Sequence, residues 1–258
     1  MLYFEYQEPY PQFSRPPRRI VSLCPSLTET LFALGVGERI VGRTKFCVRP
    51  RGQLLDAVPK VGGTKTPNIE AIRELNPDCV FAVKEENLPH DVEKIAAFAD
   101  VVVYDVKDIS SALGMIRSLK TILEVEDDLD RYVAQKWDEV RGIISGKAAC
   151  LVWRKPYMVA GGDTYIHSII THLGFENIFA DRRRYPTIGD DELRPAEFVL
   201  FPTEPYPFKD LHIRELDEKQ PHSRKASVDG QMITWYGVRM AAAADYFKAW
   251  VDDLKSSN

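Results

Sequence analysis

Residues 19–37, RIVSLCPSLTETLFALGVG, and residues 148–175, AACLVWRKPYMVAGGDTYIHSIITHLGF, follow one construction. Each begins with an apolar, β-rich stretch that predicts a strand, continues through a polar break and ends in an amphipathic helix closed by Leu-Gly. The next residues also correspond, because Glu-Arg-Ile at 38–40 is matched by Glu-Asn-Ile at 176–178. Similar elements in the same order predict two similar lobes rather than one continuous domain.

The first half of the chain alternates between strand patterns and helix patterns. Strands are expected at residues 19–23, 40–42, 79–83 and 100–106. Alternation of this kind is typical of parallel sheets with right-handed crossovers. The strands at 79–83 and 100–106 are continuously apolar, which indicates a sheet that is covered on both faces.

A long helical pattern separates the two halves. Residues 125–144, VEDDLDRYVAQKWDEVRGII, carry apolar side chains at intervals of three and four, and their acidic residues cluster near the start, where they suit the helix dipole. The expected organisation is an N-terminal lobe at 1–124, a connecting helix at 125–146 and a C-terminal lobe at 147–258. The first 17 residues are expected to form a leader segment. The fold class is therefore α/β, with two Rossmann-like lobes, each with a parallel sheet, joined by one long α-helix.

Composition excludes several classes of protein. The chain has 258 residues and a net charge of −4, which argues against nucleic-acid binding because neutralising phosphates requires a basic face. No apolar run approaches the roughly 20 residues that span a bilayer. The four cysteines are scattered, so free thiols are expected rather than disulfides or a zinc site.

The start of the sequence bears on the compartment. Residues 1–17, MLYFEYQEPYPQFSRPP, lack the basic start and the apolar core of a secretory signal. The chain as encoded is therefore expected in the cytoplasm. The periplasm is the alternative, if this sequence once followed a leader.

The carboxyl ends of the predicted strands supply candidate binding residues, because ligands of open parallel sheets bind there. If the two lobes face each other across the connecting helix, these loops line one cleft that is rich in aromatic and charged groups. The candidates are Ser26, Phe46, Glu86, Trp153, Arg154, Tyr157, Arg184, Tyr185, Tyr206 and Trp235.

Three stretches carry a resemblance to a known family. They are residues 19–48 (RIVSLCPSLTETLFALGVGERIVGRTKFCV), residues 58–82 (VPKVGGTKTPNIEAIRELNPDCVFA) and residues 153–186 (WRKPYMVAGGDTYIHSIITHLGFENIFADRRRYP), followed by EPYPFK at 204–209. Together the sequence resembles the class III, helical-backbone periplasmic substrate-binding proteins of ABC importers for vitamin B12, ferric siderophores, heme and some metals. The third stretch is similar to a branch of that family without signal peptides.

The resemblance implies two Rossmann-like lobes joined by one rigid helix, with aromatic side chains framing the ligand. Phe46 falls where vitamin B12-binding members have a cleft tyrosine, and Tyr185 where they have a tryptophan. Gly63 or Thr64 stands where another tryptophan is expected, which argues against B12 itself and leaves a corrinoid or an iron chelate.

The resemblance also implies transporter docking through one acidic residue per lobe. Glu70 matches the first, and Asp191 is expected as the second, with Asp190 and Glu192 close by. These carboxylates would meet arginines of the permease.

We therefore expect a non-catalytic binding protein for a metal chelate, a corrinoid such as vitamin B12 or a ferric siderophore. It would serve an ABC importer or act as an intracellular carrier, as a monomer with no catalytic residue, no intrinsic cofactor, no metal-ligating site and no membrane span. One alternative is a chelatase-like or corrinoid-processing enzyme that uses His167 with Asp163 or Glu86. Another is an interaction module without a small ligand.

Overall fold

The computed structural model describes residues 2–4 and 13–256, which form two compact units. Unit 1 comprises the described residues of Met1–Val106, Ser110–Val133 and Tyr236–Arg239. Unit 2 comprises those of Lys107–Ile109, Ala134–Trp235 and Met240–Asn258. Two α/β units confirm the predicted fold class, although the chain enters unit 1 a last time at residues 236–239.

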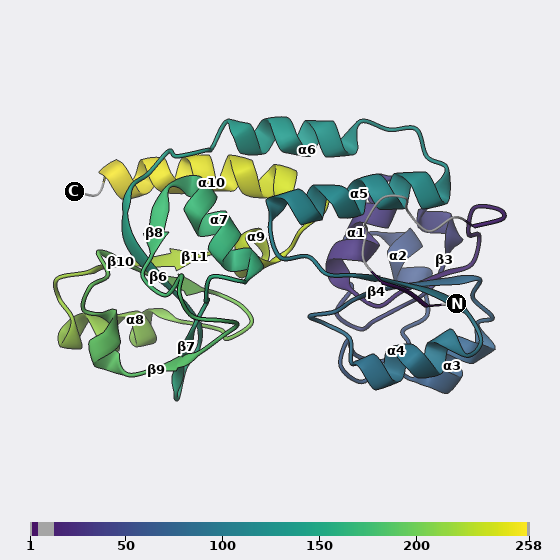
Figure 1. The fold of residues 1–258 in the computed structure, drawn as a ribbon, viewed down its shortest axis with the longest axis horizontal. Helices are drawn as coiled ribbons and strands as arrows, with labels where there is room; N and C mark the ends of the chain where they lie inside the picture. The colour runs from purple at the N-terminus through teal and green to yellow at the C-terminus, as the bar shows by residue number, and fades with distance from the viewer. Residues whose placement is uncertain (1, 5–12, 257–258) are drawn as a thin grey trace. The chain divides into compact units, whose positions relative to one another are not determined.

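Unit 1 contains a parallel sheet with helices on both faces. Its strands, in spatial order, are β1 (Leu2–Phe4), β5 (Asp100–Tyr104), β4 (Cys79–Val83), β2 (Ile20–Ser22) and β3 (Ile40–Arg43). Its helices are α1 (Pro25–Ala33), α2 (Gln53–Ala57), α3 (Ile69–Glu74), α4 (Pro89–Ala96) and α5 (Ile109–Leu123), with a short 3-10 turn, η1 (Gly37–Arg39). In Figure 1, α1 and α5 cover one face of this sheet, and α3 and α4 cover the other.

Burial on both faces explains the continuously apolar strands of unit 1. Val80 and Val101 pack with Ile72 of α3 and Ile95 of α4 in one cluster. On the opposite face, the Tyr104 hydroxyl lies 3.1 Å from the Ser118 hydroxyl of α5. Alternate residues of a strand thus contact different helix layers.

The sheet of unit 2 is mixed, so the prediction of parallel sheets in both lobes was wrong for this unit. Its strand order is β11 (Arg224–Val228), β10 (Phe198–Pro202), β6 (Gly146–Trp153), β7 (Tyr157–Val159) and β9 (Thr187–Ile188), with β8 (Phe175–Asn177) also paired to β6. β7 runs antiparallel to both β6 and β9. Only three residues connect β6 to β7, and parallel pairing requires a crossover of a dozen residues or more.

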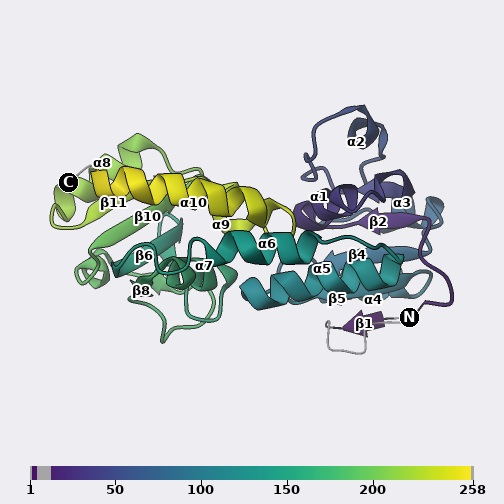
Figure 2. The same cartoon turned by 90° about the horizontal axis from the view of Figure 1, so that it is seen from above.

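Helices also cover the sheet of unit 2. They are α7 (Tyr165–Leu173), α8 (Asp210–Lys219), α9 (Gly230–Thr234) and α10 (Arg239–Ser256), with the 3-10 turn η2 (Asp190–Leu193). Leu216 of α8 packs with Leu151, Val199 and Phe201 of the sheet. α10 runs beside β10 and β11 in Figure 2, and its Trp250 indole donates a 2.9 Å hydrogen bond to the β11 backbone.

The helix predicted at 125–146 is shorter. α5 ends at Leu123 because Glu124 has a φ of 52°, and residues 125–128 are not helical. The Asp127 carboxylate accepts from the Leu129 backbone N–H, so this acid caps α6 (Leu129–Asp138) rather than lying within it. A turn through Gly142, at φ 66°, follows the helix. The boundary between the two units falls inside α6, after Val133.

The predicted leader segment, residues 1–17, lies partly outside the described residues. Leu2–Phe4 form β1, which pairs in parallel with β5. Among the described residues, no helix is both long and apolar enough to cross a membrane. All four cysteines are buried free thiols, as the sequence predicted.

Candidate ligand-binding site

Aromatic rings gather where β6 and β10 end in unit 2. Trp153, the last residue of β6, is 45% exposed, and its ring lies 5.3 Å from the Tyr206 ring in an edge-to-face arrangement. Tyr206 in turn contacts Phe208 and His212, with ring centroids 4.7 and 5.6 Å away. We call Trp153, Tyr206, Phe208 and His212 the ring cluster. It rests on the sheet, because Phe208 packs against the buried Phe201 of β10 at 5.2 Å.

A fixed cation lies beside the ring cluster. The Arg154 guanidinium forms an ion pair with Glu215 of α8, and its side chain is only 13% exposed. Burial opposes its charge, but hydrogen bonds with Tyr206 and Glu215 outweigh burial and raise the pKa of Arg154 above its ordinary value; Tyr157 adds a further hydrogen bond. A planar guanidinium held in this way suits a carboxylate or another planar acceptor at the edge of a ligand.

Four predicted residues, Trp153, Arg154, Tyr157 and Tyr206, are thus brought together within unit 2. Sequence reasoning missed two of their partners, His212 and Glu215. Both lie on α8, which begins immediately after EPYPFK at 204–209. A short connection from a strand end to a helix indicates that the first turns of that helix lie near the same edge of the sheet, and this signal could have found them.

Arg184 and Tyr185 form a second group in unit 2, on the segment between β8 and β9. The Arg184 guanidinium lies 5.8 Å from the centroid of the Tyr185 ring. The Gly161 backbone N–H donates to the Arg184 carbonyl at 2.8 Å. A Cβ at Gly161 or Gly162 would come within 2.4 Å or 2.0 Å of backbone oxygens in this segment, so these glycines allow its close approach.

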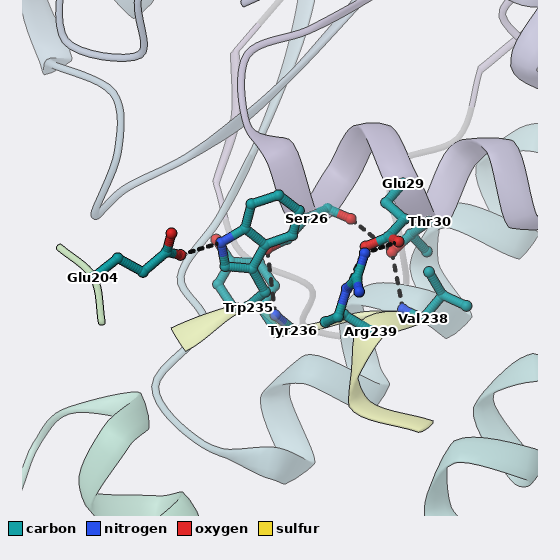
Figure 3. Close-up of polar contacts among 8 residues, drawn as sticks. All are labelled: Ser26, Glu29, Thr30, Glu204, Trp235, Tyr236, Val238 and Arg239. Atoms are coloured by element: carbon teal, nitrogen blue, oxygen red, sulfur yellow. Dashed lines mark hydrogen bonds and ion pairs between the residues drawn. The ribbon is translucent and has the colours of Figure 1, made fainter. Parts of the chain in front are cut away.

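Trp235 is attached to the loop that follows β10. Its indole N–H donates a 2.8 Å hydrogen bond to the Glu204 carboxylate, as Figure 3 shows. The Thr234 hydroxyl lies 3.4 Å from the same carboxylate oxygen. Glu204 therefore places Trp235 at the loop that also carries Tyr206.

In unit 1, Ser26 is committed to internal contacts. It is buried in the first turn of α1, where its hydroxyl oxygen accepts a 3.3 Å hydrogen bond from the Tyr236 backbone N–H (Figure 3). Its carbonyl accepts from the Thr30 hydroxyl at 2.7 Å. The side chain predicted to meet ligand instead supports the segment at 236–239.

Phe46 and Glu86 present more accessible groups in unit 1. The Phe46 ring is half exposed, with the Lys45 ammonium 5.1 Å from its centroid. Glu86, partly buried, follows β4. Burial raises the pKa of the Cys24 thiol to about 12, and the negative charge of Glu86 adds to this effect, which indicates that Glu86 lies near Cys24 at the end of β2.

The two residues predicted for transporter docking are both strongly exposed. Glu70 lies in the first turn of α3 and pairs with Arg73 at 3.5 Å. Asp191 lies in η2 and pairs with Arg194 at 2.7 Å. Each pair joins residues three apart at the surface, so it holds the carboxylate weakly and leaves it accessible.

The described residues provide no group of three or more His, Cys, Asp or Glu side chains that could hold a metal ion. His167, the base of the alternative enzymatic hypothesis, is held by a hydrogen bond within unit 2. Its Nδ1 lies 3.1 Å from the Asn177 amide nitrogen, which also donates to the Ala160 carbonyl at 3.0 Å. The Nδ1 lone pair is therefore used within the fold.

Comparison with known proteins gives a consistent result. The family model for periplasmic binding proteins matches residues 20–196. The vitamin B12-binding protein of Pectobacterium carotovorum subsp. carotovorum (strain PC1) is 27% identical over 176 residues, which cover 64% of this chain. That match spans only 63% of the relative's length, less than two thirds.

Solved structures share the fold at low identity. The periplasmic heme-binding protein RhuT from Roseiflexus sp. RS-1 has a TM-score of 0.77 and 22% identity, covering 91% of this chain and 98% of RhuT. The periplasmic vitamin B12-binding protein BtuF of Vibrio cholerae has a TM-score of 0.73 and 17% identity, covering 93% and 98%. Both support the two-lobed α/β architecture.

Proposed function

Because the chain belongs to the periplasmic binding protein family, we propose that it is the substrate-binding component of an ABC importer for a metal chelate. A corrinoid, heme or a ferric siderophore is the class of ligand. Similar proteins are named for vitamin B12 and heme, which supports this class. Membership of a family of binding proteins also favours this function over the chelatase-like enzyme.

The ring cluster at the end of β6, with Arg154 next to Trp153 in the chain and paired with Glu215, is the observation that carries the proposal. A metal chelate of this class presents a broad, partly flat surface with polar groups at its edge. The exposed Trp153 ring offers an aromatic face, and the guanidinium of the next residue, Arg154, is held in place by Glu215. The protein meets such a ligand with little ordering of its own side chains, because both groups are already fixed.

Further residues are proposed as ligand contacts on the same reasoning. In unit 2 these are Tyr157 at the start of β7, Arg184 and Tyr185 shortly before β9, and Trp235 at the end of α9. In unit 1 they are Phe46 and Glu86, whereas the buried hydroxyl of Ser26 would act indirectly. The absence of a tryptophan at Gly63 or Thr64 supports a corrinoid or iron chelate over vitamin B12 itself.

We also propose that Glu70 and Asp191 dock the protein on arginines of the permease. Their exposure and their weak pairing support this role, since a partner's arginine can replace Arg73 or Arg194 at small cost. Charge reversal of Glu70 or Asp191 should reduce transport and leave ligand affinity unchanged. An intracellular carrier without a permease is the second candidate, and cell fractionation distinguishes the two.

Ligand titration tests the proposed function. Purified protein is titrated with cyanocobalamin, cobinamide, hemin and a ferric catecholate, and tryptophan fluorescence is followed. Binding tighter than about 100 μM to at least one of them is expected, since that already corresponds to only about −5.5 kcal/mol. Saturation with none of the four would contradict the proposal.

Matched variants locate the site. Trp153→Ala and Arg154→Gln should each weaken binding about tenfold or more, as expected for anchoring groups. Trp250→Phe and Arg141→Gln are the controls, because Trp250 bonds to β11 and Arg141 is an exposed residue paired with Asp138. Equal loss in the controls would indicate a general effect on folding.

A further inference from the structure

We propose that His212 is the positioning residue of the ring cluster, and that protonation of its ring releases Tyr206 and Arg154 and so lowers ligand affinity in acid. This inference rests on the proposed function, because it concerns the same binding surface. His212 itself does not contact the ligand. It acts through the loop that carries Tyr206.

The backbone contact of His212 requires a neutral ring. His212 is the third residue of α8, and its Nδ1 accepts a 3.0 Å hydrogen bond from the Lys209 backbone N–H just before the helix. Glu or Gln ordinarily makes this reciprocal cap at the third helical position. An acceptor at Nδ1 places the single proton of neutral imidazole on Nε2.

The ring of His212 also supports the exposed aromatic residues. It is only 8% exposed and lies 5.6 Å from Tyr206 and 6.1 Å from Phe208, centroid to centroid. Tyr206 joins this support to the surface, because its ring contacts Trp153 and its hydroxyl helps to raise the pKa of Arg154. His212 therefore holds both ends of the segment at 206–209, one by ring packing and the other by the cap at Lys209.

The charges around His212 oppose its protonation. The connection between β6 and β7 contributes Arg154 and Lys155, and α8 with its cap contributes Lys209 and an opposing acid, Glu215. The loop after β10 contributes the Tyr206 and Phe208 rings. Burial lowers the pKa of His212, and Arg154 lowers it further.

Protonation would therefore disturb the surface in two ways. A proton on Nδ1 removes the acceptor and sets an N–H against the Lys209 N–H, so the cap is lost. The new positive charge also repels Arg154 and competes with it for Glu215. Both effects loosen Tyr206 and Arg154, which the proposed ligand contacts.

The pH dependence of binding tests this inference. The affinities for cyanocobalamin and for hemin are measured between about pH 8 and pH 5, where histidine changes its charge. If binding requires the neutral ring, affinity should fall by up to about tenfold per pH unit below the pKa of His212. His212→Gln should bind more weakly at every pH, because it loses the ring packing against Tyr206. Its affinity should no longer fall in acid, because glutamine can make the same cap without titrating.

His222→Gln is the matched control. His222 also lies in unit 2 and hydrogen-bonds to a backbone carbonyl, that of Arg194, at 2.9 Å, but its ring is exposed. This variant should keep the pH profile of the unmodified protein. An unchanged acid dependence in His212→Gln would overturn the inference.

Two further readouts do not depend on ligand. In the unmodified protein, ¹⁵N chemical shifts should show His212 with Nδ1 unprotonated at pH 8, and a proton on Nδ1 would overturn the inference. The near-ultraviolet circular dichroism should change between pH 8 and pH 5 more in the unmodified protein than in His212→Gln. If none of the four probes of the ligand titration binds, the proposed function fails, and these spectra still decide the role of His212.

Discussion

Arg239 and Glu29 are 210 positions apart in the sequence and form a two-bonded ion pair in unit 1 (Figure 3). The Arg239 Nε donates to one carboxylate oxygen at 2.9 Å, and Nη2 donates to the other. Their side chains are only 11% and 14% exposed. With the Tyr236–Ser26 and Val238–Thr30 hydrogen bonds, this pair attaches residues 236–239 to α1.

Removing one partner of this pair should destabilise the protein strongly. Arg239→Ala leaves the Glu29 carboxylate largely buried without its guanidinium, so the free energy of unfolding should fall by about 3 kcal/mol. Urea denaturation measures the change. Arg131→Ala, which removes an exposed pair with Asp128, should cost less than about 1 kcal/mol. Equal losses in the two variants would show that burial does not determine the effect.

Gly237 should tolerate alanine less well than Gly35. Both have a left-handed backbone, with φ of 76° and 75°. A Cβ at Gly237 would lie 2.0 Å from the Thr30 hydroxyl oxygen, whereas a Cβ at Gly35 has no neighbour within 4 Å. Gly35→Ala should therefore cost about 1–2 kcal/mol for the backbone alone, and Gly237→Ala more. Similar melting temperatures for the two variants would contradict the expected clash with Thr30.

Glu215→Gln should weaken ligand binding without a large effect on folding. It removes the ion pair that holds Arg154, which must then be ordered when ligand binds. Ordering such a side chain costs about 1 kcal/mol, or about fivefold in affinity for the probe that binds. Glu218→Gln, at an exposed position on the same helix, is the control. An unchanged affinity in Glu215→Gln would show that Arg154 does not depend on this pair.

The free energy of unfolding should decrease in acid. Burial lowers the pKa of His167, His172 and His212 in the folded protein. Below the ordinary histidine pKa of about 6.5, the unfolded chain binds more protons than the folded one, so acid favours unfolding. Stability should be constant above about pH 7 as far as these groups are concerned, and should fall as pH decreases from there. The loss of stability is measured by comparing the urea midpoints at pH 7.5 and pH 5.5. His172→Gln should make the two midpoints more similar, because it removes one of the titrating groups.

The thiols should be unreactive while the protein is folded. Burial raises the pKa of Cys24 to about 12 and also raises those of Cys47, Cys79 and Cys150. Because the thiolate is the reactive form, a thiol reagent at pH 8 should modify the native protein very slowly. In denaturant the reagent should report all four cysteines. Rapid modification of the native protein would show that one of these thiols is accessible.

Much of the fold could be predicted because it depends on local periodicity. The strands at Cys79–Val83 and Asp100–Tyr104 and the helices after Cys24 and Thr164 follow from apolar spacing, and Thr164 also caps its helix. The end of α5 was missed because Glu124, a good helix former, adopts a left-handed conformation there. The antiparallel β7 was missed because its three residues, Tyr157–Val159, lie in the stretch that corresponds to the polar break between strand and helix in the first half.

The candidate site could also be predicted only in part, since the sequence indicated individual residues but not their contacts. Aromatic and charged residues after strands indicated Trp153, Arg154, Tyr157 and Tyr206 individually. Their contact with one another, and the support from His212 and Glu215, depends on the packing of α8 against strand ends tens of residues away. For Ser26 the prediction and the structure differ. Its position after a strand suggested a ligand contact, but its hydroxyl oxygen accepts a hydrogen bond from the Tyr236 backbone N–H.

By itself, the sequence determined that this protein has two α/β units, where several of their strands and helices begin, and which strand ends carry aromatic and charged groups. These properties depend on residues within a few positions of one another. The tertiary structure alone decided which of those groups meet, as Arg154 meets Glu215 and Arg239 meets Glu29. Contacts between residues 61 and 210 positions apart arise only when separate elements pack, and no local pattern encodes them.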